Sequence, residues 1–130
     1  MSIPVVHVKA GVRFDTIGPA GFVLLSAIAS LPKLLGHDVI ITCGTDSHSM
    51  PDPHCSGEAY DLSVTGWNAS DIQTALSVFS RLGPSFYAQY EVPSVPSDDA
   101  YRLLAVVNPK ATFLPEQTWL EKHWSKYRPD

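Results

Sequence analysis

The chain has 130 residues, of which 45% are hydrophobic and 17% charged, a balance typical of a globular domain and not of a disordered segment. Its formal net charge is −4 and its nine lysines and arginines are scattered, so the sequence offers no basic surface for nucleic acid. Two cysteines do not make a disulfide scaffold. We therefore expect a single domain over residues 1–130, which acts as a monomer and binds no nucleic acid.

The N-terminus lacks a basic segment followed by an apolar one, so the sequence predicts no signal peptide. The longest apolar run, residues 21–29, is too short to cross a bilayer. We expect a protein that is made in the cytoplasm and does not insert into a membrane.

The first third of the chain predicts one buried helix between two extended segments. Residues 3–8 are expected to enter the fold in extended form, and the alternation of residues 12–15 predicts a short strand. Apolar residues at helical spacing predict a largely buried helix over residues 19–30. Pro32 is expected to end this helix or to begin a second short turn, which Gly36 closes.

A strand, a long loop and a second strand are predicted next. The β-branched run at residues 39–43 predicts a buried strand, and residues 44–57, rich in Gly, Ser, Asp and Pro, predict a shaped loop. Residues 58–64 alternate with the period of a strand, so one set of side chains faces the core and the other faces away. The core set is Tyr60, Leu62 and Val64, and the opposite set is Ala59, Asp61 and Ser63.

The remaining elements complete a small sheet. An amphipathic helix is predicted over residues 70–82, with Asn68 or Ser70 as its N-cap, and residues 86–92 alternate as a strand. Residues 93–111 resemble an insertion between two strands, within which the apolar run 100–107 fits a short helix or a strand. The final strand is expected over 117–123.

A histidine at the end of the predicted loop and a carboxylate on the strand that follows it are expected to come together across a glycine turn. His54 and Asp61 supply two of the ligand types that a mononuclear zinc site uses, and Gly57 allows positive φ between them. A surface histidine and a turn-capping aspartate would fit the same residue types. Cys43 is expected in the core, whereas Cys55 beside His54 could act as an adventitious ligand.

Residues 54–61 match the HxxGxAxD signature of the M15 zinc peptidases. This family includes D-Ala-D-Ala carboxypeptidases and phage L-Ala-D-Glu endolysins, and the hedgehog signalling domain resembles it in fold. Residues 40–46 resemble the strand and turn that precede the signature, so the resemblance extends over residues 38–64. It implies that His54 and Asp61 are ligands of one zinc ion per chain.

The resemblance leaves the third zinc ligand open. M15-like enzymes place a carboxylate before a final histidine, and that histidine completes the zinc site. This chain has no HxH motif near its end. His123 is one candidate for the third ligand, and Glu116, which could supply an oxygen in place of a histidine nitrogen, is another. A third possibility is an incomplete site in a non-catalytic relative.

The resemblance also implies a carboxylate that serves as general base. Glu91, at the end of a predicted strand, resembles the family's strand-end glutamate, and Glu121, two residues before His123, is the alternative. His48 matches a histidine of phage-type members and is expected to contact the substrate. Relatives often carry an arginine nearby that binds a substrate carboxylate; here Arg13 or another distant basic residue would have this role.

The sequence thus predicts an α+β domain in which a small antiparallel sheet, covered by two main helices, forms the floor of a zinc cleft. The predicted activity is hydrolysis of an amide bond in the stem peptide of peptidoglycan, as in phage-type cell-wall lysis, after release of the protein to the wall. The D-Ala-D-Ala and L-Ala-D-Glu bonds are both possible targets. The alternative is a non-catalytic relative that binds metal or cell wall, or that is part of a virion.

Overall fold

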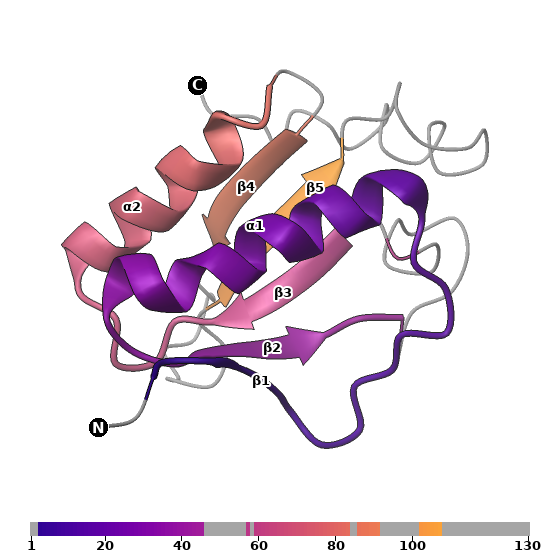
Figure 1. Ribbon diagram of the computed structural model, residues 1–130, viewed down its shortest axis with the longest axis horizontal. Helices are drawn as coiled ribbons and strands as arrows, with labels where there is room; N and C mark the ends of the chain where they lie inside the picture. Colours follow the sequence, from indigo (N-terminus) through magenta and orange to yellow (C-terminus); the bar gives the residue numbers. More distant parts are fainter. Residues whose placement is uncertain (1–2, 46–56, 58, 84–85, 92–101, 108–130) are drawn as a thin grey trace.

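The computed structural model describes residues 3–45, 57, 59–83, 86–91 and 102–107. In these residues five strands form one sheet with the order β1-β2-β3-β5-β4, and the helices α1 and α2 lie across one face of it (Figure 1). The predicted α+β architecture, a small sheet covered by two helices, is confirmed. The elements are β1 (Val6–Val8), α1 (Pro19–Leu35), β2 (Val39–Cys43), β3 (Ala59–Ser63), α2 (Ala69–Ser80), β4 (Phe86–Glu91) and β5 (Arg102–Val107).

The sheet is mixed. β1 runs parallel to β2, whereas the β2–β3, β3–β5 and β4–β5 pairs are antiparallel. β5 lies between β3 and β4, so residues 102–107 belong to the sheet and not to an insertion over 93–111. Their apolar run was compatible with either a helix or a strand, and pairing on both sides selects the strand. The strand expected over 117–123 lies outside the described residues.

α1 ends later than the sequence predicts, whereas α2 begins where it is expected. α1 continues through Pro32 to Leu35, where Gly36, at φ 81°, donates its N–H to the Pro32 carbonyl over 2.8 Å. Pro32 neither ends the helix nor begins a separate turn, because a proline in the last turn removes only one helical hydrogen bond, but the closure at Gly36 is as expected. α2 begins as expected, with Asn68 and Asp71 forming a reciprocal capping box.

The segment 12–15 is not a strand. Its backbone bonds to Thr45, just beyond the end of β2, where the Thr45 N–H donates to the Arg13 carbonyl over 2.8 Å. Local alternation predicted a strand here, but a strand also needs a continuous ladder of backbone partners. The segment instead connects β1 to α1 as irregular backbone.

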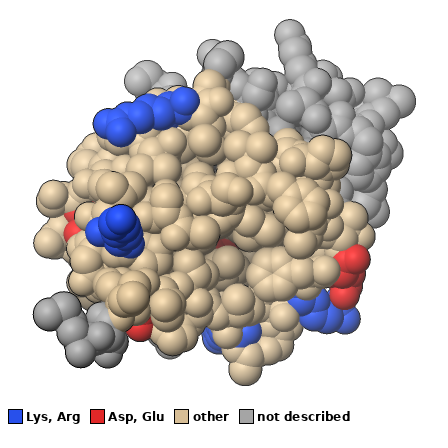
Figure 2. All heavy atoms as spheres, viewed as in Figure 1, with Lys and Arg blue, Asp and Glu red and all other residues tan. Residues whose placement is uncertain are grey.

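The core lies between the helices and the sheet. Tyr60, Leu62 and Val64 of the β3 segment are buried in it, as the alternation predicts, together with Leu24, Ile28 and Leu31 of α1 and Ala75 and Phe79 of α2. The outer surface of this side is largely uncharged (Figure 2), and Lys33 is the one charged residue of α1. Neither described helix has the length and apolarity that a bilayer crossing requires.

Candidate metal centre

Asp61 lies in the middle of the sheet, on the face away from the helices. Its neighbours Tyr60 and Leu62 point into the core, so the alternation of β3 turns Asp61 to the opposite face. The residue is only 3% exposed, and its Oδ2 lies 3.5 Å from Nη1 of Arg102, a half-exposed residue of β5. A buried carboxylate is costly unless it is paired with a cation. The Arg102 guanidinium therefore offsets part of the cost of burying this carboxylate.

Gly57 is fixed by close approach of backbone from two other segments. Its φ is 70°, and a Cβ at this position would collide with the carbonyl of Thr16. A Cβ on Gly21 of α1 would collide in turn with the carbonyl oxygen of Gly57. The buried Tyr60 hydroxyl donates to that same oxygen over 2.7 Å. Because these contacts leave no room for a side chain, glycine is required here by packing as well as by φ.

The residue between the turn and Asp61 is also constrained. Ala59 is completely buried, at the register position opposite Val106 of β5. A larger side chain at a fully packed position displaces its neighbours. Gly57, Ala59 and Asp61 are three of the four residues in the signature pattern, and local packing accounts for the first two.

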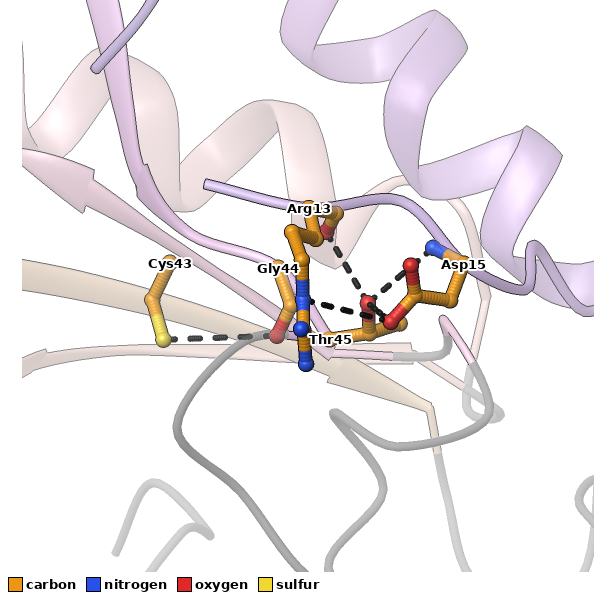
Figure 3. Close-up of polar contacts among 5 residues, drawn as sticks. All are labelled: Arg13, Asp15, Cys43, Gly44 and Thr45. Carbon is orange, nitrogen blue, oxygen red and sulfur yellow. Dashed lines mark hydrogen bonds and ion pairs between the residues drawn. The ribbon is translucent and has the colours of Figure 1, made fainter. Parts of the chain in front are cut away.

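Thr45 anchors the other end of the loop that begins at residue 46. Its N–H donates to the Arg13 carbonyl over 2.8 Å, and its Oγ1 accepts the N–H of Asp15 over 3.0 Å. The same hydroxyl lies 3.1 Å from both the Arg13 carbonyl and Oδ2 of Asp15, either of which can accept its proton. Figure 3 shows these contacts converging on Thr45, next to Gly44, where a Cβ would collide with the Arg13 carbonyl.

Both ends of the segment 46–56 are therefore held by one stretch of chain, residues 13–21. Thr45 is bonded to the beginning of this stretch and Gly57 is packed against its later part. We call this set of contacts, formed by residues 13–21 with Gly44, Thr45, Gly57 and Tyr60, the loop anchor. It fixes the positions of Thr45 and Gly57 relative to each other, the two described residues between which the predicted ligand His54 lies in the sequence.

Gln89 shares with Asp61 the face of the sheet away from the helices. In the strand register, Asp61 is opposite Leu104, which is opposite Gln89 of β4. The Oε1 atom of Gln89 is buried and has no hydrogen-bond partner within the described part of the chain. Glu91 of β4, the expected base, is opposite Arg102 of β5. Since β5 lies between β4 and β3, strand spacing places the Glu91 backbone about 10 Å from β3.

The other candidate site residues cannot be placed. His48, His54, Glu116, Glu121 and His123 lie outside the described residues. Across residues 3–45, 57, 59–83, 86–91 and 102–107, no three histidine, cysteine, aspartate or glutamate side chains gather as a metal site. The expected zinc site is therefore represented here by Asp61 alone, whose carboxylate is a donor type that zinc accepts.

Arg13 lies near the start of the segment 46–56, whereas Cys43 is not in the core as expected. Arg13 has its Nε 3.3 Å from Oδ2 of Asp15, and both side chains are more than half exposed beside Thr45 (Figure 3). An arginine is thus present where the candidate loop begins. Cys43, expected in the core, is only half-buried and pairs with Asp61 across a bulge between β2 and β3.

Sequence reasoning missed Arg102 and Gly21. Arg102 follows a polar loop and precedes an apolar run, so nothing local indicates that it meets Asp61, which is 41 residues away. Gly21 lies in a helix, where glycine is unfavourable, and that cost was the one available signal of a close backbone approach.

Comparison with known proteins gives no relative for this chain, because no protein-family model, curated protein or solved structure matches it.

Proposed function

We propose that this domain is a zinc-dependent peptidase that hydrolyses an amide bond in the stem peptide of bacterial peptidoglycan. The observation that carries the proposal is the burial of Asp61, the last residue of the HxxGxAxD pattern, on the face of the sheet away from the helices. The packing that demands glycine and alanine at positions 57 and 59 supports it further, because a chance match to the pattern would not need those residue types.

The proposed zinc ligands are His54, Asp61 and His123, with Glu116 as the alternative to His123. Bound zinc would polarise the scissile carbonyl and lower the pKa of a bound water towards about 7. The loop anchor supports this assignment because Gly57, three residues after His54, is fixed against the chain that also holds Thr45.

The remaining roles belong to side chains around the sheet face. Glu91, or Glu121 in its place, accepts a proton from the attacking water and delivers it to the leaving amine. His48 contacts the substrate. The carboxylate of a stem peptide needs a cation in a chain whose net charge is −4, and Arg13 and Arg102 are the described arginines nearest to the candidate loop and to Asp61.

In this proposal the protein acts as a monomer on the cell wall, after release from the cell in which it is made, as phage-type lysis enzymes do. Both the D-Ala-D-Ala and the L-Ala-D-Glu bond fit this chemistry.

The test is metal content combined with turnover. Elemental analysis of the purified wild type is expected to give about one zinc per chain. The variant His123→Ala should lose this zinc, whereas Glu116→Ala should keep it. Zinc kept in the first variant and lost in the second would move the third ligand to Glu116. A wild type that takes up no metal when zinc is supplied contradicts the proposal.

The missing HxH motif favours the alternative, a non-catalytic relative. An assay with isolated muropeptides distinguishes that relative from an enzyme. Glu91→Gln should retain zinc and lose at least about a hundredfold in kcat, because a general base contributes on that order. Glu121→Gln is the matched variant at the alternative position, and the one that loses turnover identifies the base. A zinc-loaded wild type that cleaves neither muropeptides nor cell walls would show that the domain binds without catalysis.

A further inference from the structure

His37, in the connection between α1 and β2, has both ring nitrogens on acceptors. Its Nδ1 lies 2.9 Å from the backbone carbonyl of Asp38, and its Nε2 lies 3.0 Å from Oδ2 of Asp71 in α2. Neither acceptor carries a proton, so each nitrogen must donate one. A neutral imidazole has a single N–H, and only the imidazolium form can make both bonds.

The contact joins two elements that are distant in the sequence. Asp71 is in the first turn of α2, where its side chain accepts the Asn68 N–H and the Asn68 side chain accepts the Asp71 N–H, over 3.2 and 2.8 Å. The bond from His37 is added to this capping box and is not part of it. Loss of the bond would therefore undock the first turn of α2 without removing its cap.

The charged groups around His37 come from three segments. Asp38 is on its own connection, Asp71 faces it from α2, and His7 of β1 lies on the far side of Asp38, with its Nε2 2.7 Å from Oδ2. Trp67, which precedes α2, packs near the His37 ring with 5.7 Å between ring centroids. We call His7, His37, Asp38 and Asp71 the ionic corner.

These surroundings favour the protonated ring. The hydrogen bond to the Asp38 carbonyl raises the pKa of His37 most, the hydrogen bond and charge of Asp71 raise it further, and partial burial opposes them. The folded pKa therefore lies above the ordinary value of 6.5. The protonated His37 ring therefore contributes its full stabilisation below pH 6.5, and this stabilisation is lost as the pH rises through the folded pKa.

We propose that His37 is a pH-operated latch, which fastens the first turn of α2 to the α1–β2 connection when protonated and releases it when neutral. The neutral ring can keep one of its two donors, so it must give up either Asp38 or Asp71. α2 packs on both β4 and α1, and release of its first turn loosens that cover of the sheet. The latch operates near neutral pH, where histidine is the side chain suited to respond.

The first measurement is an NMR titration of the wild-type imidazoles, assigned by comparison with His37→Gln. The His37 resonances must titrate above 6.5 and must move together with the indole N–H signal of Trp67. Amide hydrogen exchange, corrected for intrinsic rate, should show the first turn of α2 losing protection over the same range while β3 does not. A His37 that titrates at or below 6.5 overturns the latch.

The second measurement is the unfolding equilibrium constant from about pH 5.5 to about pH 8.5. Relative to His37→Gln, the wild-type constant should rise with pH, by up to about tenfold per unit between the unfolded and folded pKa values. His7→Gln is the matched control, because it removes the other histidine of the ionic corner and should keep the transition. Equal pH dependence in wild type and His37→Gln contradicts the proposal, and if that variant does not fold, the wild-type titration decides.

Discussion

The loop anchor and the ionic corner hold distant segments together by opposite means. The anchor relies on backbone packed against backbone, with glycine wherever a Cβ would collide, and on hydrogen bonds that are buried or partly buried. The corner relies on partly exposed imidazoles and carboxylates. The anchor should therefore be sensitive to one added methyl group and indifferent to pH, whereas the corner should tolerate shape changes and respond to protons.

The largest effect is expected from Gly57→Ala in the anchor. Gly57 and Gly66 both have positive φ, at 70° and 83°, but a Cβ on Gly66 would meet open space. Gly66→Ala should lower the free energy of unfolding by about 1 kcal/mol, the cost of the left-handed conformation. Gly57→Ala should lower it by about 3–5 kcal/mol, because the carbonyl of Thr16 must also move.

Urea unfolding of both variants at one pH measures this difference. Equal losses at the two positions would mean that the backbone around Gly57 moves aside easily, and that the anchor is not rigid.

An intermediate effect is expected from Tyr60→Phe. The substitution keeps the ring, which packs near Phe14 with 6.0 Å between centroids, and removes the hydroxyl that donates to the Gly57 carbonyl. A buried acceptor without its donor costs about 1–3 kcal/mol. Unfolding followed at about pH 5.5 and about pH 8 should give the same loss, because no group that titrates in this range is involved. A loss confined to one of these pH values would contradict the distinction between the two regions.

The smallest effect is expected from Asp38→Asn in the corner, and it should be present near neutral pH and vanish in acid. The Val5 N–H, followed by His7, holds the pKa of Asp38 below its ordinary value of 3.8. Its stabilisation is therefore present above that value and is lost as the pH falls through the folded pKa. Asparagine keeps an oxygen for the Val5 N–H but has no charge, so the advantage of the wild type should disappear on acidification. Acid titrations followed by circular dichroism measure it, and an advantage that persists in strong acid would assign it to shape and not to charge.

Local patterns predicted what local forces decide. The alternation that puts Tyr60 in the core and Asp61 on the opposite face is the alternation of the observed strand. The cap of α2 at Asn68 follows from residue types within one turn. These features depend on neighbours in sequence, so one sequence suffices to find them.

Contacts between distant segments were beyond the sequence. Nothing near Gly21 indicates that Gly57 packs against it, and His37 had no assigned role because its partner Asp71 is 34 residues away. Arg102 is further still from Asp61. The sequence thus predicted Asp61 and the strand that carries it. It did not predict Arg102 beside this carboxylate or the packing of residues 13–21 against Thr45 and Gly57.

The position of β5 has a consequence for how the chain folds during synthesis. Among the described strands, β4 is hydrogen-bonded to β5 alone, and β5 follows it in the chain. A nascent chain that has emerged only as far as Glu91 can pair β1, β2 and β3, but it has no template to which β4 can be added. Completion of the sheet must wait for Arg102–Val107 to leave the ribosome and pair with both β4 and β3, and the pairing with β3, such as Asp61 with Leu104, is non-local and therefore slow to form.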